Sequence, residues 1–225
     1  MGEPAANLLY RWPAAAKLGS RVPKEKFYEH GTVTAAVREK FVAEVQRITW
    51  VYKLAETTIN LRCSDAVPEI QVFQIDVKGK DVSELVLATI DKAIPFPIIF
   101  EIIQAEGDEQ SIRMVAAHKQ LGTGTPTLSA YYSTGWQPAD ADRQPLPITI
   151  TLPALYTALF DPLLPVSALP GEEMSEVAAR LQSVRKLERE IAVLERKLRT
   201  EPQLNRMIEL RRTLKKKQAE LEEQR

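Results

Sequence analysis

The chain has 225 residues, of which 44% are hydrophobic and 27% are charged, and thirty Lys and Arg balance thirty Asp and Glu. This apolar content excludes an intrinsically disordered chain, and the length suffices for one domain with an appendage. The formal net charge of zero excludes a basic field over the whole chain that would attract nucleic acid. A single cysteine excludes an internal disulfide framework and a cysteine zinc cluster.

Neither a signal peptide nor a membrane span is expected. Residues 1–10 have no basic region followed by a sustained apolar run. The best apolar run, 93–103, is interrupted by Pro95 and Pro97 and contains Glu101. It is also shorter than the roughly 18 apolar residues of a membrane-spanning helix. We therefore expect a cytoplasmic protein without a membrane-spanning segment.

Composition changes once along the chain, near residue 170. Fourteen of the fifteen prolines precede Gly171, and no aromatic residue follows Phe160. From residue 172 onward the residues are mostly good helix formers. The sequence therefore predicts a mixed α/β domain over 1–165, a linker over 166–171 and a helical region over 172–225.

The first region shows both helical and strand periodicity. Residues 34–54 place apolar side chains at steps of three or four, which predicts one helix. Residues 69–77 alternate between apolar and polar types, which predicts a strand. The alternation slips between Val72 and Ile75, which indicates a bulge or a strand buried on both faces. A second helix is expected over 81–93, before Pro95.

The remaining elements complete a central mixed sheet, so the expected fold class is mixed α+β. Strands over 98–104 and 112–118 are expected to pair as a hairpin around residues 106–108, which include a glycine. Further elements are predicted as strands over 128–133 and 148–151 and a helix over 155–160.

The second region has the spacing of a coiled-coil seam. Apolar residues from Val177 to Leu198 recur at steps of three and four, close to a period of 3.5. Residues 200–202 interrupt this pattern, which resumes at Leu204 with Lys217 in one of its slots. A short turn between two helices predicts an antiparallel hairpin, and one long helix kinked at a proline is the alternative.

The seam also supplies the candidate contact residues. Ile208 lies off the seam and is expected to face outward. The side chains expected to hold the hairpin together or to contact a partner, which is a second copy of the chain or another protein, are Leu187, Ile191, Leu194, Leu198, Met207, Ile208, Leu210, Leu214 and Leu221.

Residues 172–225 carry fourteen Lys and Arg against eleven Glu, a net charge of about +3. The pattern fits the solvated face of a coiled coil. It also fits contact with phosphates, which would make the affinity for DNA fall with added salt. The densest basic cluster consists of Arg211, Arg212, Lys215, Lys216 and Lys217.

Carboxylates in the first region suggest an alternative function, that of a metal-dependent nuclease. Asp76 and Lys78 end one predicted strand, Glu101 lies on the next, and Glu39 and Glu44 lie on the preceding helix. Oxygen ligands of this kind suit Mg²⁺. Restriction-type nuclease cores, however, place the paired acid and the acid-x-lysine on adjacent hairpin strands, whereas a helix is expected between these two strands. We therefore assign no catalytic residue, metal or cofactor.

Cysteine chemistry has no support from a local motif. It would require Cys63 beside His30 or His118, and nothing near these residues indicates such a pairing. A lone cysteine is more often buried and inert, which is the expectation for Cys63.

Several sequence blocks resemble those of the bacterial domain-of-unknown-function 4391 family. They are 22–29 (VPKEKFYE), 48–54 (ITWVYKL), 58–61 (TINL), 90–95 (IDKAIP) with 98–101 (IIFE), and 134–136 (TGW). With the C-terminal helical pattern, the resemblance covers nearly the whole chain. Members of this family tend to lie beside DNA methyltransferases and Swi/Snf-type helicases in restriction and phage-defence gene clusters.

The resemblance implies an accessory role and supplies no catalytic residues. We expect a non-catalytic subunit or adaptor that docks through its coiled-coil arm onto a helicase or DNA methyltransferase. A metal-dependent nuclease and a DNA-binding adaptor that uses the basic cluster remain the alternatives.

Overall fold

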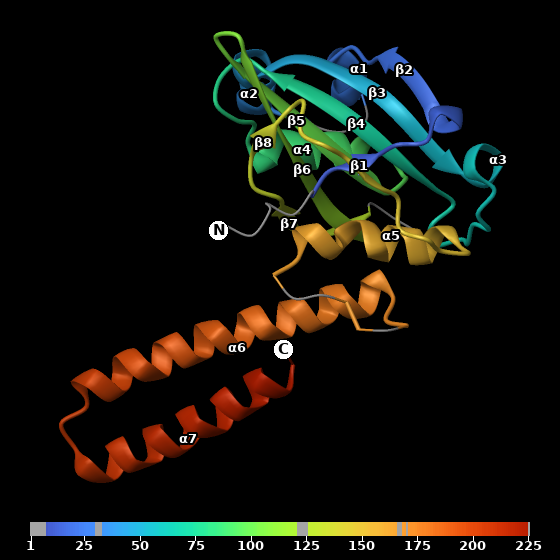
Figure 1. Cartoon of the computed structure of the whole chain (residues 1–225). Helices are drawn as coiled ribbons and strands as arrows, with labels where there is room; N and C mark the ends of the chain where they lie inside the picture. Colours follow the sequence, from blue (N-terminus) through green and yellow to red (C-terminus); the bar gives the residue numbers. More distant parts are fainter. Residues whose placement is uncertain (1–7, 30–32, 121–125, 166–167, 170, 225) are drawn as a thin grey trace, which may run out of the picture. The chain divides into compact units, whose positions relative to one another are not determined.

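The computed structural model describes residues 8–29, 33–120, 126–165, 168–169 and 171–224. The chain divides into two compact units, Met1–Ala168 and Leu169–Arg225 (Figure 1). Residues 166, 167 and 170 of the expected linker lie outside the described residues.

The first unit is built on a seven-stranded mixed sheet with the order β2-β3-β4-β5-β6-β7, in which β8 also pairs with β6. Only β4 and β5 pair in parallel, and the other neighbours are antiparallel. A separate parallel pair joins β1 (Tyr10–Arg11) to β9 (Gln144–Pro145). The sheet strands are β2 (Lys17–Arg21), β3 (Val45–Ala55), β4 (Glu69–Val77), β5 (Ile98–Glu106), β6 (Glu109–Gln120), β7 (Thr127–Ser133) and β8 (Gln137–Pro138).

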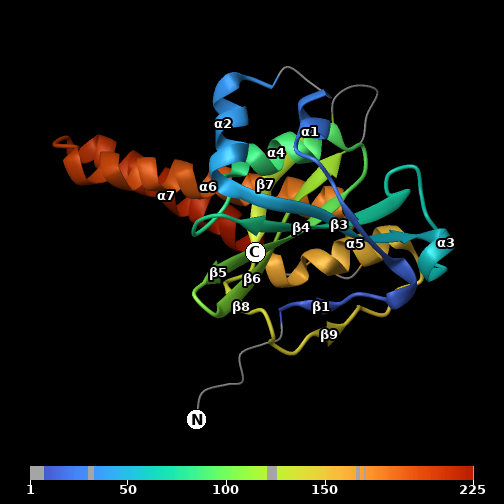
Figure 2. The same ribbon diagram turned by 90° about the horizontal axis from the view of Figure 1, so that it is seen from above.

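Helices cover both sides of this sheet. Figure 2 shows α2 and α4 on one side, and α5 together with β1 on the other. The parallel pairing of β4 and β5 requires a crossover connection, and α4 supplies it. The helices of this unit are α1 (Glu25–Glu29), α2 (Ala35–Glu44), α3 (Glu56–Ile59), α4 (Glu84–Ala93) and α5 (Leu152–Phe160), with 3-10 turns at Ala14–Ala16 and Asp161–Leu163.

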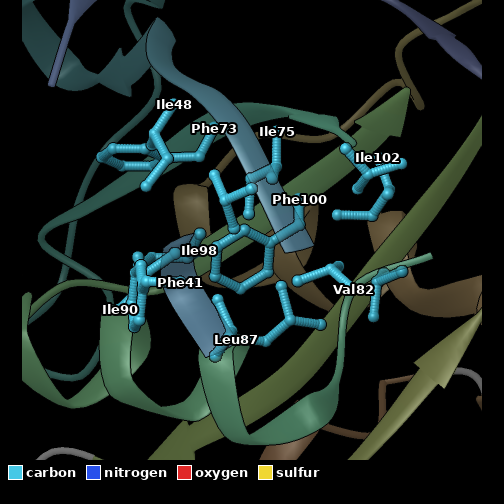
Figure 3. Close-up of a cluster of buried hydrophobic side chains, with 14 of the residues drawn as sticks. Phe41, Ile48, Phe73, Ile75, Val82, Leu87, Ile90, Ile98, Phe100 and Ile102 are labelled. Carbon is cyan, nitrogen blue, oxygen red and sulfur yellow. The ribbon is translucent and has the colours of Figure 1, made fainter. Parts of the chain in front are cut away.

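The main core lies between the sheet and the layer of α1, α2 and α4 (Figure 3). Phe73 and Ile75 of β4 and Phe100 and Ile102 of β5 point into it, and Phe41 of α2 packs against them. Strand side chains alternate between the two faces of a sheet, so residues 74, 76 and 101 lie on the opposite face.

The predicted helix over 34–54 is wrong beyond Glu44, where α2 ends and β3 begins. Residues 48–52 read Ile-Thr-Trp-Val-Tyr, and β-branched and aromatic side chains favour an extended backbone. β3 pairs with β2 on one side and with β4 on the other. Strand pairing therefore outweighed the helical spacing of the apolar residues.

The predicted strand over 148–151 is also wrong. Only Thr151 makes a strand-like bridge, to Arg62. Ile148 and Ile150 are 102% and 85% exposed, so these alternating apolar side chains do not pack against a core. A strand forms only where a neighbouring backbone pairs with it, and the described part of the chain places none beside residues 148–150.

The other strand and helix predictions of this unit are confirmed within a few residues at each end. β5 and β6 form the expected hairpin, in which Glu106 pairs with Glu109. Gly107 in the turn has φ 63°, a conformation that glycine adopts without strain.

The second unit consists of α6 (Met174–Thr200) and α7 (Leu204–Glu223), which pack against each other as an antiparallel hairpin. Pro202 lies in the connection between them, so the alternative of one continuous kinked helix is wrong. Within the described residues, no helix has both the length and the apolar character to cross a membrane.

Candidate functional site

The α6–α7 hairpin has a buried apolar cluster where the middle of α6 meets the end of α7. There Leu187, Ile191 and Leu221 form a buried cluster with Val184, and Leu214 packs against it. Val184, Leu187, Ile191 and Leu221 are 6–9% exposed, and Leu214 is half-buried. This part of the seam therefore closes on itself within the chain.

Toward the connection between the helices the seam is more open. Leu194, Leu198, Met207 and Leu210 are half-buried. Leu204 was expected in the seam, but it is 68% exposed. A helix has about 3.6 residues per turn, so two successive steps of three, from Leu204 to Leu210, rotate Leu204 away from the seam.

The predicted basic cluster divides into two groups. Lys217 forms ion pairs within the hairpin, where its ammonium lies 3.1 Å from both Glu190 and Glu220. Its hydrogen bonds with Glu220 and Glu190 raise its pKa. Lys216 lies 3.9 Å from Glu220 in an exposed pair. These two lysines are therefore partly neutralised.

Arg211, Arg212 and Lys215 are exposed and form no ion pair with the described residues. Ile208 is 51% exposed, and Leu204 precedes it by one helical turn. Residues three or four apart lie on the same face of a helix. We call this face the α7 strip; it consists of Leu204, Ile208, Arg211, Arg212 and Lys215.

Asp76, the acid of the candidate nuclease site, is held in an ion pair on the sheet. β3, where the sequence predicts a helix, is the antiparallel neighbour of β4 and places Arg47 opposite Asp76. Arg47 Nε donates to one carboxylate oxygen at 2.6 Å, and Gln74 Nε2 donates to the other at 2.9 Å. The adjacent hairpin strand that such a nuclease core requires is present, but it carries a cation where an acid would bind metal.

The lysine and the helical carboxylates of that candidate site are engaged elsewhere. Lys78 Nζ donates to the Val42 carbonyl at 2.7 Å. Glu44 accepts the backbone N–H of Ser83 at 2.8 Å, at the start of α4. Burial raises the pKa of Glu44, but the hydrogen bonds from Ser83 and Lys40 outweigh it and lower that pKa overall. Glu39 is exposed.

Glu101 is a buried structural acceptor. It is 4% exposed and accepts hydrogen bonds from Trp12 Nε1 at 2.8 Å and from Arg143 Nη1 at 2.6 Å. Among the described residues, no group of three or more His, Cys, Asp and Glu side chains is arranged to hold a metal ion. The carboxylates of the candidate nuclease site therefore bind different partners and do not form one metal site in the described residues.

A buried ion pair that the sequence analysis missed joins α4 to β6. Asp91 and Lys119 have fully buried side chains 2.9 Å apart. Lys119 Nζ also donates to three backbone carbonyls, those of Asp91 at 2.7 Å, Ile94 at 2.8 Å and Phe96 at 2.6 Å. The signal was present, because Asp91 follows the core residue Leu87 by four positions and so lies on the buried face of its helix.

Burial is the largest influence on both members of this pair. It raises the pKa of Asp91, which Lys119 and the Tyr131 hydroxyl lower in part. It lowers the pKa of Lys119, which Asp91 raises in part. The ammonium satisfies carbonyls at the C-terminal end of α4, where a cation is favoured. The arrangement joins helix α4 to strand β6 of the sheet.

The cysteine expectation is wrong in one respect, because Cys63 is exposed rather than buried. Its Sγ lies 3.3 Å from a Glu56 carboxylate oxygen, and this hydrogen bond raises the thiol pKa. A raised pKa leaves less of the reactive thiolate. His30 lies outside the described residues, and His118 is a half-buried side chain next to Tyr156.

Comparison with known proteins gives one match. A family model described as "Domain of unknown function (DUF4391)" covers residues 11–221, which include most of both units. No curated protein and no solved structure matches the chain.

Proposed function

The chain belongs to the DUF4391 family, and we propose that it is a non-catalytic accessory subunit of a DNA-targeting restriction or phage-defence complex, docked onto a helicase or DNA methyltransferase through the α6–α7 hairpin. The observation that carries this proposal is the α7 strip, an exposed face that combines two large apolar side chains with three cations. The kind of partner follows from the family resemblance, and the docking surface follows from the hairpin.

The apolar part of the strip is the source of affinity. Leu204 is 68% exposed and Ile208 is 51% exposed. Burying such a side chain fully is worth about 1.5–3 kcal/mol, so covering the exposed parts of both is worth about 2–4 kcal/mol. A partner helix with apolar residues at steps of three and four would cover them in the way a helix enters a groove.

The positive charge around the connection between α6 and α7 favours a partner with an acidic surface. Residues 195–215 contain seven Lys and Arg against three Glu, a net charge of +4. Complementary charge raises the association rate and excludes partners of the same sign. The docking face on the helicase or methyltransferase is therefore acidic around an apolar centre.

Coiled-coil packing of the hairpin is part of the same proposal. The buried cluster of Val184, Leu187, Ile191 and Leu221 anchors the two helices at one end. The half-buried leucines farther along provide room for a third helix to add its side chains to the seam. We take the partner segment to be that third helix.

The test is binding of the purified full chain, and of an Ile208→Asp variant, to any helicase or DNA methyltransferase that the neighbouring genes encode. Both wild-type and variant should melt alike, because the substituted side chain is exposed, and the variant should lose at least about tenfold in affinity. Val193→Asp is the matched control, since Val193 is 53% exposed on α6 outside the strip. Binding by wild-type and control but not by Ile208→Asp supports the proposal.

Two results would refute it. Equal affinity of the Ile208→Asp variant and the wild-type removes the strip from the interface. If the free chain self-associates, so that its measured mass rises with concentration, and only Ile208→Asp abolishes this, the strip is a contact between two copies instead.

The DNA-binding alternative predicts that the chain alone binds duplex DNA. Its affinity should fall steeply with salt and should be lost in an Arg211→Ala/Arg212→Ala variant.

A metal-dependent nuclease is the second candidate, and the adjacency of β3 and β4 favours it. It requires Asp76 to leave Arg47 and bind Mg²⁺ together with another carboxylate. Mg²⁺-dependent DNA cleavage by the purified chain that Asp76→Asn abolishes would support it. Cleavage absent at every Mg²⁺ concentration tested would remove it.

A further inference from the structure

A polar pocket opens on the face of the sheet that lies opposite the core of Figure 3. It has a volume of about 480 Å³ and lies where β3 begins and where β4 and β5 end. Gln74 and Asp76 reach it because they alternate along β4 with the core residues Phe73 and Ile75. Its polar lining consists of Arg21, Gln46, Arg47, Gln74, Asp76 and Gln110.

Arg47 is oriented within this pocket before any ligand arrives. Asp76 accepts from Arg47 Nε at 2.6 Å and also contacts its Nη2, and Gln74 Nε2 holds the second carboxylate oxygen at 2.9 Å. A guanidinium has five N–H donors in a planar fork, and this pair uses two of them. The side chain remains 54% exposed, so the other donors are open to a ligand.

Arg21 supplies the second cation. Arg21 pairs with Thr49, and Thr49 pairs with Gln74, so the three residues form one row across β2, β3 and β4. Its exposed guanidinium forms no ion pair with a described residue. The two arginines and Asp76 give the lining a net charge of +1, and the three glutamines add neutral donors and acceptors.

We propose that this pocket binds a single phosphate ester, that of a nucleotide or of the end of a nucleic-acid strand, with Arg47 and Arg21 on the phosphate. Arginine forks match phosphate oxygens in a bidentate manner. The pocket exceeds what a bare anion needs and falls in the range of about 300–1,000 Å³ typical of small-molecule sites. The glutamine amides are suited to hydrogen bonds with a sugar or a base.

The neighbouring surface on one side of the pocket disfavours a second phosphate. A second pocket shares Gln110 with this one, and Asp108, Glu109 and Asp140 line it. These carboxylates repel a polyanion that continues in that direction. A nucleotide or a strand terminus fits this boundary, whereas a strand that crosses both pockets does not.

The experiment is calorimetric titration of the full chain with adenosine monophosphate, inorganic phosphate, and a six-nucleotide single strand with either a 5′-phosphate or a 5′-hydroxyl. We expect binding of the nucleotide or of the phosphorylated strand, and a loss of about tenfold or more in both Arg47→Ala and Arg21→Ala. Arg47→Lys, which keeps the charge but not the fork, should lose affinity as well. Arg62→Ala, at an exposed arginine outside the pocket, is the matched control.

The titrations distinguish a free nucleotide from a strand end as the ligand, and no outcome depends on the docking proposal. Tighter binding of the nucleotide identifies a free nucleotide as the source, and tighter binding of the phosphorylated strand identifies a strand end. The proposal is overturned if the variants at 21 and 47 melt normally and bind like wild-type, or if Arg211→Ala/Arg212→Ala alone removes binding. A 5′-hydroxyl strand that binds as tightly as both the nucleotide and the phosphorylated strand, or inorganic phosphate as tight as the nucleotide, overturns it too.

Discussion

Replacement of Lys119 by methionine tests the buried pair at the junction of α4 and β6. The substitution keeps most of the side-chain volume and removes the ammonium. Asp91 then lacks its cation, and the carbonyls of Asp91, Ile94 and Phe96 lose a donor. Removing one partner of a buried ion pair costs about 3–5 kcal/mol. For a domain of this size that lowers the melting temperature by roughly 6–20 °C.

Urea unfolding followed by circular dichroism measures this loss. The matched control is Lys40→Met, because Lys40 forms an exposed ion pair with Glu44 at 3.1 Å and its side chain is 45% exposed. Exposed helical pairs contribute about 0.3–0.5 kcal/mol. In the Lys119→Met background, Asp91→Asn should restore part of the stability, because the amide leaves no uncompensated buried charge. A Lys119→Met variant no less stable than Lys40→Met would refute the reasoning.

The pH dependence of the same variant follows from Asp91. Burial raises its pKa in the folded state above the unfolded value, and the loss of Lys119 removes an influence that lowers it. A group with a raised folded-state pKa binds protons more tightly when folded, so acid stabilises the variant. The destabilisation should be largest at neutral and alkaline pH and should shrink as the pH falls through the folded-state pKa. A deficit that grows in acid would contradict this.

Three further changes have defined outcomes. Leu187→Ala, in the buried seam, should cost about 2–4 kcal/mol of local hairpin stability by hydrogen exchange, whereas Leu204→Ala should change it by less than about 0.5 kcal/mol. Asn60 has φ 55°, so Asn60→Val should destabilise by about 1–2 kcal/mol in urea unfolding and Asn60→Gly should not. Glu101→Gln should cost about 1–3 kcal/mol and change Trp12 fluorescence, because the charged acceptor for Trp12 and Arg143 is lost; a spectrum identical to wild-type would contradict that contact.

The hairpin could be predicted from sequence because its information is local. Apolar steps of three and four from Val177 to Leu198 define one helical face, and Pro202 marks the connection. The sequence also predicted β4 and α4. β4 alternates apart from the slip between Val72 and Ile75, and α4 has a helical period and ends at a proline-bearing segment. The basic cluster was visible, but its division into the paired Lys217 and the unpaired Arg211 was not, because Glu190 lies on the other helix.

The sequence alone therefore determined the mixed α+β class and the pair of C-terminal helices, since each depends on the spacing of neighbouring side chains. The tertiary structure decided that residues 45–55 form a strand, because pairing with β2 and β4 outweighs their helical spacing. It also decided the surroundings of each charged group. Asp76 meets Arg47, and Asp91 meets Lys119, across separations of 29 and 28 residues that no local pattern reports. Charges interact through space, and only the folded sheet brings these partners within a few ångströms of each other.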